Sequence, residues 1–175
     1  DVDHDLASEK TANSGRHPLP DPHLLSEKLS QWGMTNNKQA IVYDDAGGAF
    51  ASRMWWILKW LGHTNVAVLD GALGAWMSNG GKLSTKPTIF ERDVFNPSIK
   101  NDMHVSIKDV EEAQYKMSKL ILDARSKERY LGIKDEVDPV AGHIPGAISH
   151  PLGKNLNKNG HFRSPEELRL NFNKL

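Results

Sequence analysis

Asp44 is the first residue whose position suggests chemistry. It follows the apolar run 40–43 and precedes Gly47 and Gly48. Parallel α/β sheets hold ligands at such a place, beyond the carboxyl end of a strand and against the N-terminus of the next helix. A thiolate there would be a stabilised nucleophile, whereas a carboxylate is a poor one. Asp44 is therefore either a degenerate nucleophile position or a carboxylate that caps the helix, and the second interpretation is favoured.

Arg125 and Arg129 form a second candidate site, because they lie four residues apart after the apolar run 120–122. On a helical turn their guanidinium groups share one side, where they could hold an anion such as sulfate or a carboxylate. For Arg125 an ion pair with Asp123 or Glu128 is the favoured alternative. Arg129 is therefore the candidate for binding an anion.

Eight histidines raise the question of a metal site. None shows the H-x-x-x-H or H-E-x-x-H spacing, and the nearest pair, His17 and His23, is six residues apart with prolines between. We predict no metal site and no cofactor. His143 lies between Gly142 and Ile144 in a tight Gly and Pro segment, and a hydrogen-bonded structural role is favoured over that of a base.

Composition narrows the class of protein. The 175 residues suffice for one ordinary domain or two very small ones. The 22 basic residues balance the 22 acidic ones, so we expect neither a nucleic-acid nor a membrane partner. No run approaches the roughly 20 apolar residues of a membrane span, and residues 1–5 lack signal-peptide character, so a soluble, cytoplasmic protein is expected. The absence of cysteine excludes disulfides, thiolate metal sites and a cysteine nucleophile within the chain.

The elements that must position these residues alternate between strand and helix. Apolar runs predict buried strands over 40–43, 66–69 and 120–123 and a fourth starting at 147. Caps and helical spacing predict helices over 22–33, 51–61, 72–79, 106–117 and from 165 onward. The tryptophans of the second helix and Trp76 are expected in the core or at a domain interface, and core packing is favoured. The pattern predicts an α/β class with a parallel sheet flanked by helices.

Several spaced motifs resemble the two-domain rhodanese-type sulfurtransferases. The segment 41–76 contains Tyr-Asp at a strand end, a Trp-Trp helix and Leu-Asp-Gly, and it resembles the second half of the inactive N-terminal domain, with Ala72 where a second Gly is usual. The motifs 122–125, 129–130, 142–147 and 162–168 resemble the first half of the catalytic C-terminal domain. The resemblance implies a rhodanese-like sheet and parts of two tandem domains, 1–81 and 104–175, joined by a linker over 82–103.

The resemblance also implies a function. Such enzymes move sulfane sulfur from thiosulfate or 3-mercaptopyruvate to cyanide or a thiol acceptor through a cysteine persulfide. The cysteine would lie in a loop beyond Leu175, so we expect this chain alone to be inactive. Its partners would be a small-molecule donor, a small-molecule acceptor and the missing remainder of its own polypeptide. Asp44 would occupy the nucleophile's position in the inactive domain.

Three further residues take roles from the resemblance. Arg129 matches the family's substrate-binding arginine. Asp138 stands where mercaptopyruvate-type members carry a second arginine, which favours thiosulfate as the donor. Asp3 and His17 match an Asp and a His that are proposed to form a relay with a serine in mercaptopyruvate-type members, which favours the other donor. The donor is therefore left open.

Two alternatives remain. A cysteine-less, rhodanese-like binding or scaffold protein would use its Arg129 pocket to hold an anion without catalysis. Separately, the two half-domains could combine into one permuted domain, which would place segments 40–43 and 120–123 in one sheet.

Overall fold

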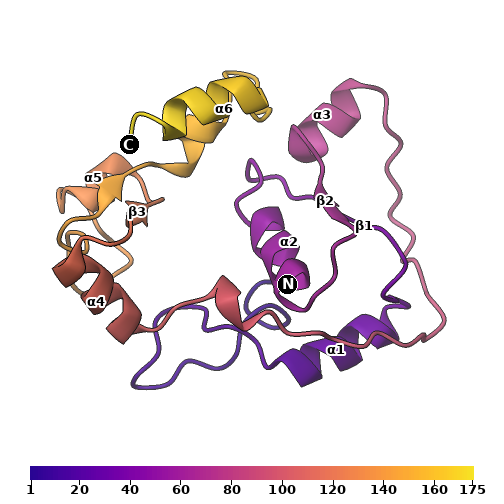
Figure 1. Ribbon diagram of the computed structural model, residues 1–175. Coiled ribbons are helices and arrows are strands. Elements are labelled where there is room, and N and C mark those ends of the chain that lie inside the picture. Colours follow the sequence, from indigo (N-terminus) through magenta and orange to yellow (C-terminus); the bar gives the residue numbers. More distant parts are fainter. The chain divides into compact units, whose positions relative to one another are not determined.

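The computed structural model describes residues 1–175 and divides into two compact units, residues 1–103 and 104–175 (Figure 1). Each unit contains one two-stranded sheet. The strands found within 40–43 and 120–123 therefore lie in different sheets, and the hypothesis of one permuted domain is wrong. The two strands of each sheet are consecutive along the chain, which is the arrangement that short connections favour.

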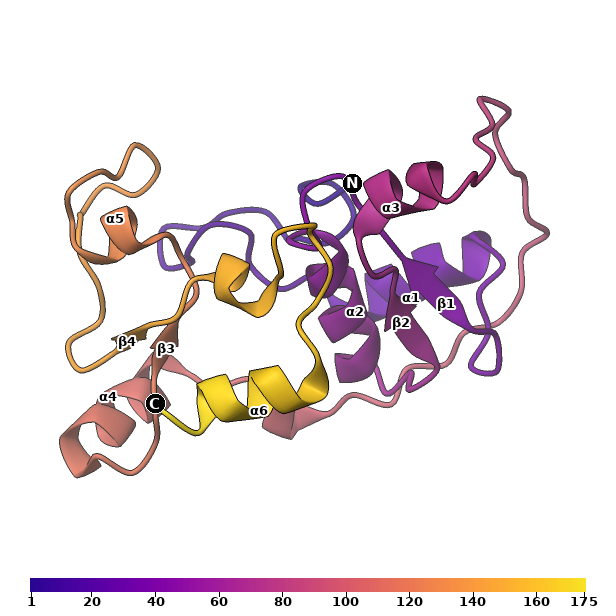
Figure 2. The same cartoon turned by 90° about the horizontal axis from the view of Figure 1, so that it is seen from above.

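Unit 1 is built around a parallel strand-helix-strand motif. Its helices and strands are α1 (Pro22–Gln31), β1 (Ala40–Val42), α2 (Ala51–Trp60), β2 (Val66–Val68) and α3 (Ala72–Ser78). β1 and β2 are parallel with Ile41 opposite Ala67, and α2 lies alongside both strands (Figure 2). Asp21 begins α1, because its Oδ1 accepts the N–H groups of His23 and Leu24, both at 2.9 Å. The predicted helix starts and the parallel pairing are confirmed.

The core of unit 1 lies between the apolar faces of α1 and α2. Its buried members are Leu6, Leu25, Leu29, Ile57, Leu58, Trp60, Leu61, Val66 and Phe95. Phe95 comes from the segment 82–103, which has no regular structure except a 3-10 turn at Asn101–Met103. The later part of that segment packs on unit 1, where the Ser98 N–H donates to the Leu61 carbonyl at 2.8 Å. Gly62 permits this approach, because a Cβ there would lie 2.5 Å from the Ser98 oxygen.

The tryptophans divide between core and surface. Trp60 is buried, Trp55 and Trp56 are half-buried, and Trp76 is 46% exposed. Core packing is confirmed for Trp60, whereas Trp76 lies outside the core. The short helix α3 lays the Trp76 ring over the turn at Gly81 instead, and its indole N–H donates to the Lys82 carbonyl at 3.1 Å.

Unit 2 has the same alternation with shorter strands. Its helices and strands are α4 (Ile107–Lys116), β3 (Leu122–Asp123), α5 (Lys127–Tyr130), β4 (Ile148–Ser149), a 3-10 helix (Leu152–Asn155) and α6 (Pro165–Phe172). β3 and β4 are parallel. Capping boxes at Ser106 with Asp109 and at Ser164 with Glu167 begin α4 and α6, as the sequence predicts.

Burial in unit 2 differs from the prediction. Leu120 and Leu122, expected in a buried strand, are 54% and 39% exposed. The two-residue strands form too small a sheet to cover them, and the buried apolar side chains of unit 2 are Ala113 and Ala147. A pocket of about 500 Å³ opens beside β3 and is lined by residues 121–125, 140–144 and 147.

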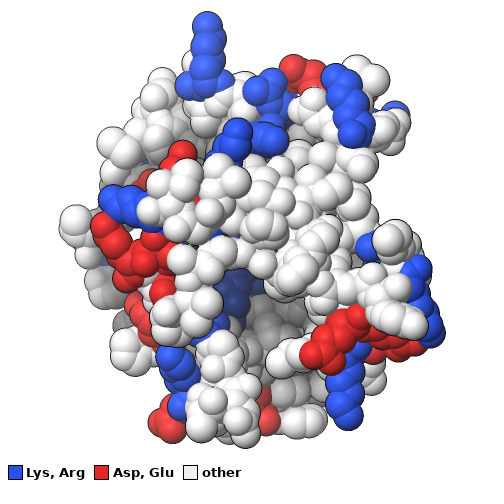
Figure 3. All heavy atoms as spheres, turned by 90° about the vertical axis from the view of Figure 1, so that its left-hand side faces the viewer, with Lys and Arg blue, Asp and Glu red and all other residues white.

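The surface carries charges of both signs. Figure 3 shows basic and acidic side chains interspersed over one face of the molecule, in keeping with 22 residues of each sign. None of the helices has the length and apolar character that a bilayer crossing requires.

Candidate functional site

Asp44 sits just beyond β1, and its carboxylate is enclosed by backbone amides. Oδ1 accepts the N–H groups of Ala46 at 3.0 Å and Gly48 at 2.8 Å, and Oδ2 accepts those of Phe50 and Ala51 at 2.9 Å each. Burial acts to raise the pKa of Asp44, but the four N–H donors outweigh it and hold the pKa below its ordinary value. Asp44 therefore caps α2 from the preceding loop, and its role as a degenerate nucleophile position stays a prediction.

Asp3 and His17 are brought together by the fold of unit 1. His17 Nε2 lies 2.8 Å from Asp3 Oδ1, and the side chains are 38% and 70% exposed, respectively. His17 has a φ of 52°, in the left-handed region that non-glycine residues rarely occupy. The contact has the geometry that a carboxylate needs to orient an imidazole.

Lys28 ties the segment that carries Asp3 to α1. Its Nζ lies 2.8 Å from Asp5 Oδ1 and also donates to the His4 carbonyl at 2.8 Å. The hydrogen bond from Lys28 lowers the pKa of Asp5. The segment that follows Asp3 is thus held against α1 by Lys28.

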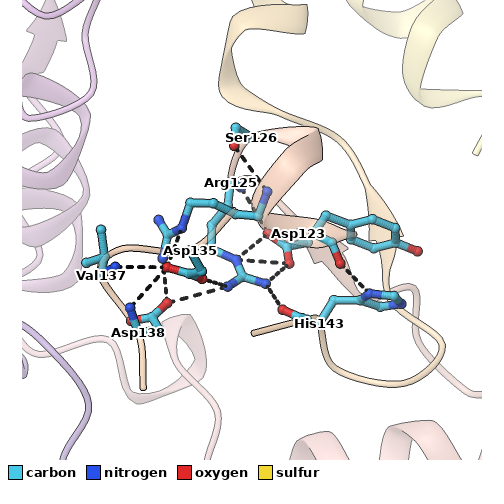
Figure 4. Close-up of polar contacts among 10 residues, drawn as sticks. Asp123, Arg125, Ser126, Asp135, Val137, Asp138 and His143 are labelled. Carbon is cyan, nitrogen blue, oxygen red and sulfur yellow. Dashed lines mark hydrogen bonds and ion pairs between the residues drawn. The ribbon is translucent and has the colours of Figure 1, made fainter. Parts of the chain in front are cut away.

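Arg125 forms a structural ion pair in unit 2 (Figure 4). Its Nη2 lies 2.7 Å from Asp123 Oδ2, its Nε lies 3.0 Å from Asp123 Oδ1, and Nη2 also donates to the Gly142 carbonyl at 2.6 Å. These bonds from Arg125 lower the pKa of Asp123. The prediction of a structural ion pair is confirmed, with Asp123 as the main partner. Nη1 of Arg125 also lies 3.5 Å from Asp135 Oδ2 and 3.4 Å from Asp138 Oδ2.

Arg129 is also engaged by carboxylates. Its Nε lies 3.3 Å from Asp135 Oδ1, and its Nη2 contacts Asp138 Oδ2. The Asp135 side chain is fully buried, whereas Arg129 is 22% exposed and Asp138 is 32% exposed. Backbone N–H groups of Asp138 and Val137, together with Arg129, hold the pKa of Asp135 below its ordinary value. An anion that approaches Arg129 must therefore either displace the Asp138 carboxylate or share the guanidinium with it.

Asp135 is a site residue that the sequence does not single out. It accepts the Asp138 N–H at 3.0 Å and the Val137 N–H at 3.1 Å, so it closes a turn that also presents Asp138. The Asp-x-x-Asp spacing that follows two arginines was the available signal.

His143 has the structural role expected of it. Its Nδ1 lies 2.6 Å from the Tyr130 carbonyl oxygen, and its ring stacks on the Tyr130 ring with centroids 3.7 Å apart. Tyr130 in turn donates its hydroxyl to the Ala147 carbonyl at 2.9 Å. His143 therefore supports the loop that lines the pocket beside β3.

The candidate residues are distributed over both units. Asp3, His17 and Asp44 belong to unit 1, and Arg129 belongs to unit 2. The structure contains no group of three His, Cys, Asp or Glu side chains suited to a metal ion. The absence of a bound metal stays a prediction.

Comparisons with known proteins agree with this fold. Residues 6–79 match the family model of the rhodanese-like domain. The chain is 37% identical over its full length to a Pseudomonas aeruginosa protein named "Probable 3-mercaptopyruvate sulfurtransferase", of which it covers 62%. It is 31% identical to the thiosulfate sulfurtransferase of Bos taurus, in an alignment covering 88% of this chain and 54% of the relative.

Solved structures give the same result. The crystal structure of SseA from Escherichia coli, described as a 3-mercaptopyruvate sulfotransferase, superposes with a TM-score of 0.83 at 28% identity and covers 97% of this chain and 63% of its own. The chain thus spans less than two thirds of the relatives that it matches. It contains a rhodanese-like domain and is a homologue of the 3-mercaptopyruvate and thiosulfate sulfurtransferases.

Proposed function

We propose that this chain is part of a longer sulfurtransferase whose nucleophilic cysteine lies outside these 175 residues. The observation that carries the proposal is similarity to sulfurtransferases along the full chain together with a complete absence of cysteine. In the proposed reaction a thiolate attacks the outer sulfur of thiosulfate, the S–S bond breaks and sulfite leaves. Cyanide then takes the sulfane sulfur from the persulfide, which releases thiocyanate and regenerates the thiolate.

Arg129 would hold the anionic end of the donor. It has the fixed fork of donors that suits a sulfonate or carboxylate, and it retains 22% exposure. Because Asp138 already binds this fork, a donor would exchange one anionic partner for another. Arg129 would thus contribute affinity for the donor, and it would select donors whose anionic group can replace the Asp138 carboxylate.

The Asp3–His17 pair would act as a proton relay toward a hydroxyl of the catalytic loop. His17 Nε2 faces Asp3, which leaves Nδ1 as the ring nitrogen available to such a hydroxyl. Asp44 would mark the position that a nucleophile occupies in a catalytic domain, filled here by a carboxylate whose charge is stabilised by four backbone N–H groups.

The sulfur donor is proposed only as thiosulfate or 3-mercaptopyruvate. Asp138 beside Arg129 favours thiosulfate, whereas the Asp3–His17 pair favours 3-mercaptopyruvate. The ratio of kcat/KM for the two donors decides between them. The cytoplasmic location, the tandem-domain arrangement and the absence of nucleic-acid or membrane partners stay predictions.

The test compares this chain with the longer gene product. Thiocyanate formation from thiosulfate and cyanide is expected to be absent in the 175-residue chain and present once the downstream loop is included. Within the longer protein, Arg129→Met should raise KM for the donor, whereas Lys127→Met, on the same short helix, should not. Turnover by the 175-residue chain with no other polypeptide present would overturn the proposal.

The second candidate function is anion binding without catalysis. The absence of cysteine from a chain that keeps Arg129 favours it. The coding sequence after Leu175 discriminates the two, because a cysteine-containing loop supports the enzyme and a stop codon supports the binding protein.

A further inference from the structure

Arg53, in the first turn of α2, binds two segments that precede α1. Its Nε and Nη2 donate to the Leu6 carbonyl at 3.0 and 2.7 Å. Nη2 also donates to the carbonyls of His17 at 2.9 Å and Pro18 at 3.2 Å. The guanidinium is half-buried, and this burial lowers the pKa of Arg53. One side chain thus joins α2 to both ends of the loop 6–18.

The two ends of this loop carry the two members of the relay. Asp3 lies three residues before Leu6, which is buried in the core of unit 1, and His17 lies directly before Pro18. The Ser8 N–H also donates to the Pro18 carbonyl at 3.2 Å, so the loop is closed at its base. This closure brings the segment that carries Asp3 beside the segment that carries His17.

His17 is held at both its backbone and its ring. Its φ of 52° lies in the left-handed region, which is unfavourable for a residue with a Cβ, so surrounding contacts must maintain it. Arg53 binds the His17 carbonyl and Asp3 binds the ring. Without the bond from Arg53, the backbone would relax and turn the imidazole away from Asp3.

We infer that Arg53 is a positioning residue that sets the contact between Asp3 and His17. The inference rests on the proposed function, because it assigns Arg53 to the relay of that function. The arginine fork suits this task, since it reaches carbonyl oxygens of both segments at once, whereas a lysine ammonium acts as a single point. Arg53 itself touches neither the Asp3 carboxylate nor the His17 ring.

The experiment measures the coupling between Asp3 and His17 by NMR in the isotopically labelled 175-residue chain. At one fixed pH, Asp3→Asn replaces an anionic acceptor with an amide and should move the ring ¹⁵N resonances of His17. In an Arg53→Met background the same substitution should move them at least about threefold less, because the two side chains no longer meet. Arg53→Lys should give an intermediate displacement.

Lys59→Met is the matched control. Lys59 also lies on α2 and donates to a carbonyl, that of Thr64 at 2.8 Å, but it touches neither end of the loop 6–18. The displacement caused by Asp3→Asn should therefore be the same in the Lys59→Met background as in the wild type. This control separates positioning from a general loss of helix stability.

Tryptophan emission reports whether the variants keep unit 1 folded. If Arg53→Met does not fold, the displacement is measured in the Arg53→Lys variant instead. An equal displacement of the His17 resonances in the wild type and in the folded Arg53 variant would overturn the inference. Failure of the proposed function would look different: Asp3→Asn would leave turnover of the longer enzyme unchanged while the NMR coupling persisted.

Discussion

Each unit places an aspartate at the carboxyl end of its first strand, and the two carboxylates are balanced in different ways. Asp44, after β1, accepts four backbone N–H groups from its own loop and from α2. Asp123, at the end of β3, is held mainly by the Arg125 guanidinium. The first arrangement depends on the path of the main chain and the second on the pairing of side chains.

The surroundings of the two aspartates differ as well. Unit 1 has a buried apolar core, whereas unit 2 buries only Ala113 and Ala147 among its apolar side chains. The ion-pair network that joins Arg125 and Arg129 to Asp123, Asp135 and Asp138 should therefore carry a larger share of the stability of unit 2. The two units can be followed separately, because all five tryptophans lie in unit 1.

Removal of the Asp44 carboxylate should have the largest effect. Asp44→Ala leaves four amides without their charged acceptor, and we expect unit 1 to lose about 3 kcal/mol of unfolding free energy. Urea titration followed by tryptophan fluorescence measures the loss. Asp45→Ala is the matched control, because Asp45 is exposed and makes no side-chain hydrogen bond, and it should change little. Equal effects of the two substitutions would show that the four hydrogen bonds from backbone N–H groups to Asp44 do not stabilise unit 1.

Arg125→Met should have the next largest effect, confined to unit 2. It leaves Asp123, whose side chain is 10% exposed, without its cation, and should cost about 2 kcal/mol. Amide hydrogen exchange at Ile148 and His150, whose N–H groups join β4 to the Ile121 and Asp123 carbonyls at 2.9 Å, should accelerate about 30-fold.

The control for this substitution is Lys127→Met, since Lys127 is exposed and forms no ion pair. Its exchange rates should match those of the wild type, and the tryptophan-detected stability should be unchanged in both variants. A loss of unit 1 stability in Arg125→Met would contradict the assignment of the network to unit 2.

The elements of both units could be predicted from the sequence because their signals are local. Asp21 followed by Pro22, and the Ser-x-x-acid patterns at Ser106 and Ser164, mark helix starts that the structure reproduces. Burial could not be predicted in the same way. Leu122 has the neighbours of a core strand in sequence, but its exposure depends on how much of a sheet surrounds it.

The contacts of the candidate site also differ in predictability according to how far apart the partners lie in sequence. The ion pair of Arg125 with Asp123 is predictable because the partners are two residues apart. The binding of Arg129 by Asp135, and of three distant carbonyls by Arg53, depends on loops whose paths carry no periodic signal. The Asp3–His17 contact was predictable only through the resemblance to a family.

Asp138→Asn should remove the anionic partner of Arg129 Nη2 in unit 2 while leaving Nε paired with Asp135. Because Asp138 competes for the Arg129 fork, its neutralisation should tighten thiosulfate binding about fivefold, equivalent to about 1 kcal/mol. A titration at constant ionic strength, followed by the Arg129 Nε–H resonance, measures the affinity. Glu136→Gln is the control, since exposed Glu136 pairs with Lys134 at 3.2 Å. Equal affinities in the Asp138→Asn variant and the wild type would show that Asp138 does not compete.

Acid titration should give the smallest difference between the units. The pKa values of Asp44 and Asp123 are both lowered in the fold, so each carboxylate stabilises its unit above the unfolded-state pKa of about 3.9 and loses this contribution as pH falls through the folded-state pKa. Asp44→Asn should therefore flatten the loss of tryptophan-detected stability below about pH 4, though not abolish it, because the lowered pKa of Asp5 keeps part of the dependence. Asp123→Asn should flatten the pH dependence of amide exchange in unit 2 and leave the tryptophan-detected stability of unit 1 unchanged. Added salt should weaken the acid dependence in unit 2 more than in unit 1, because it screens the Asp123–Arg125 ion pair while the amides around Asp44 are fixed by the main chain.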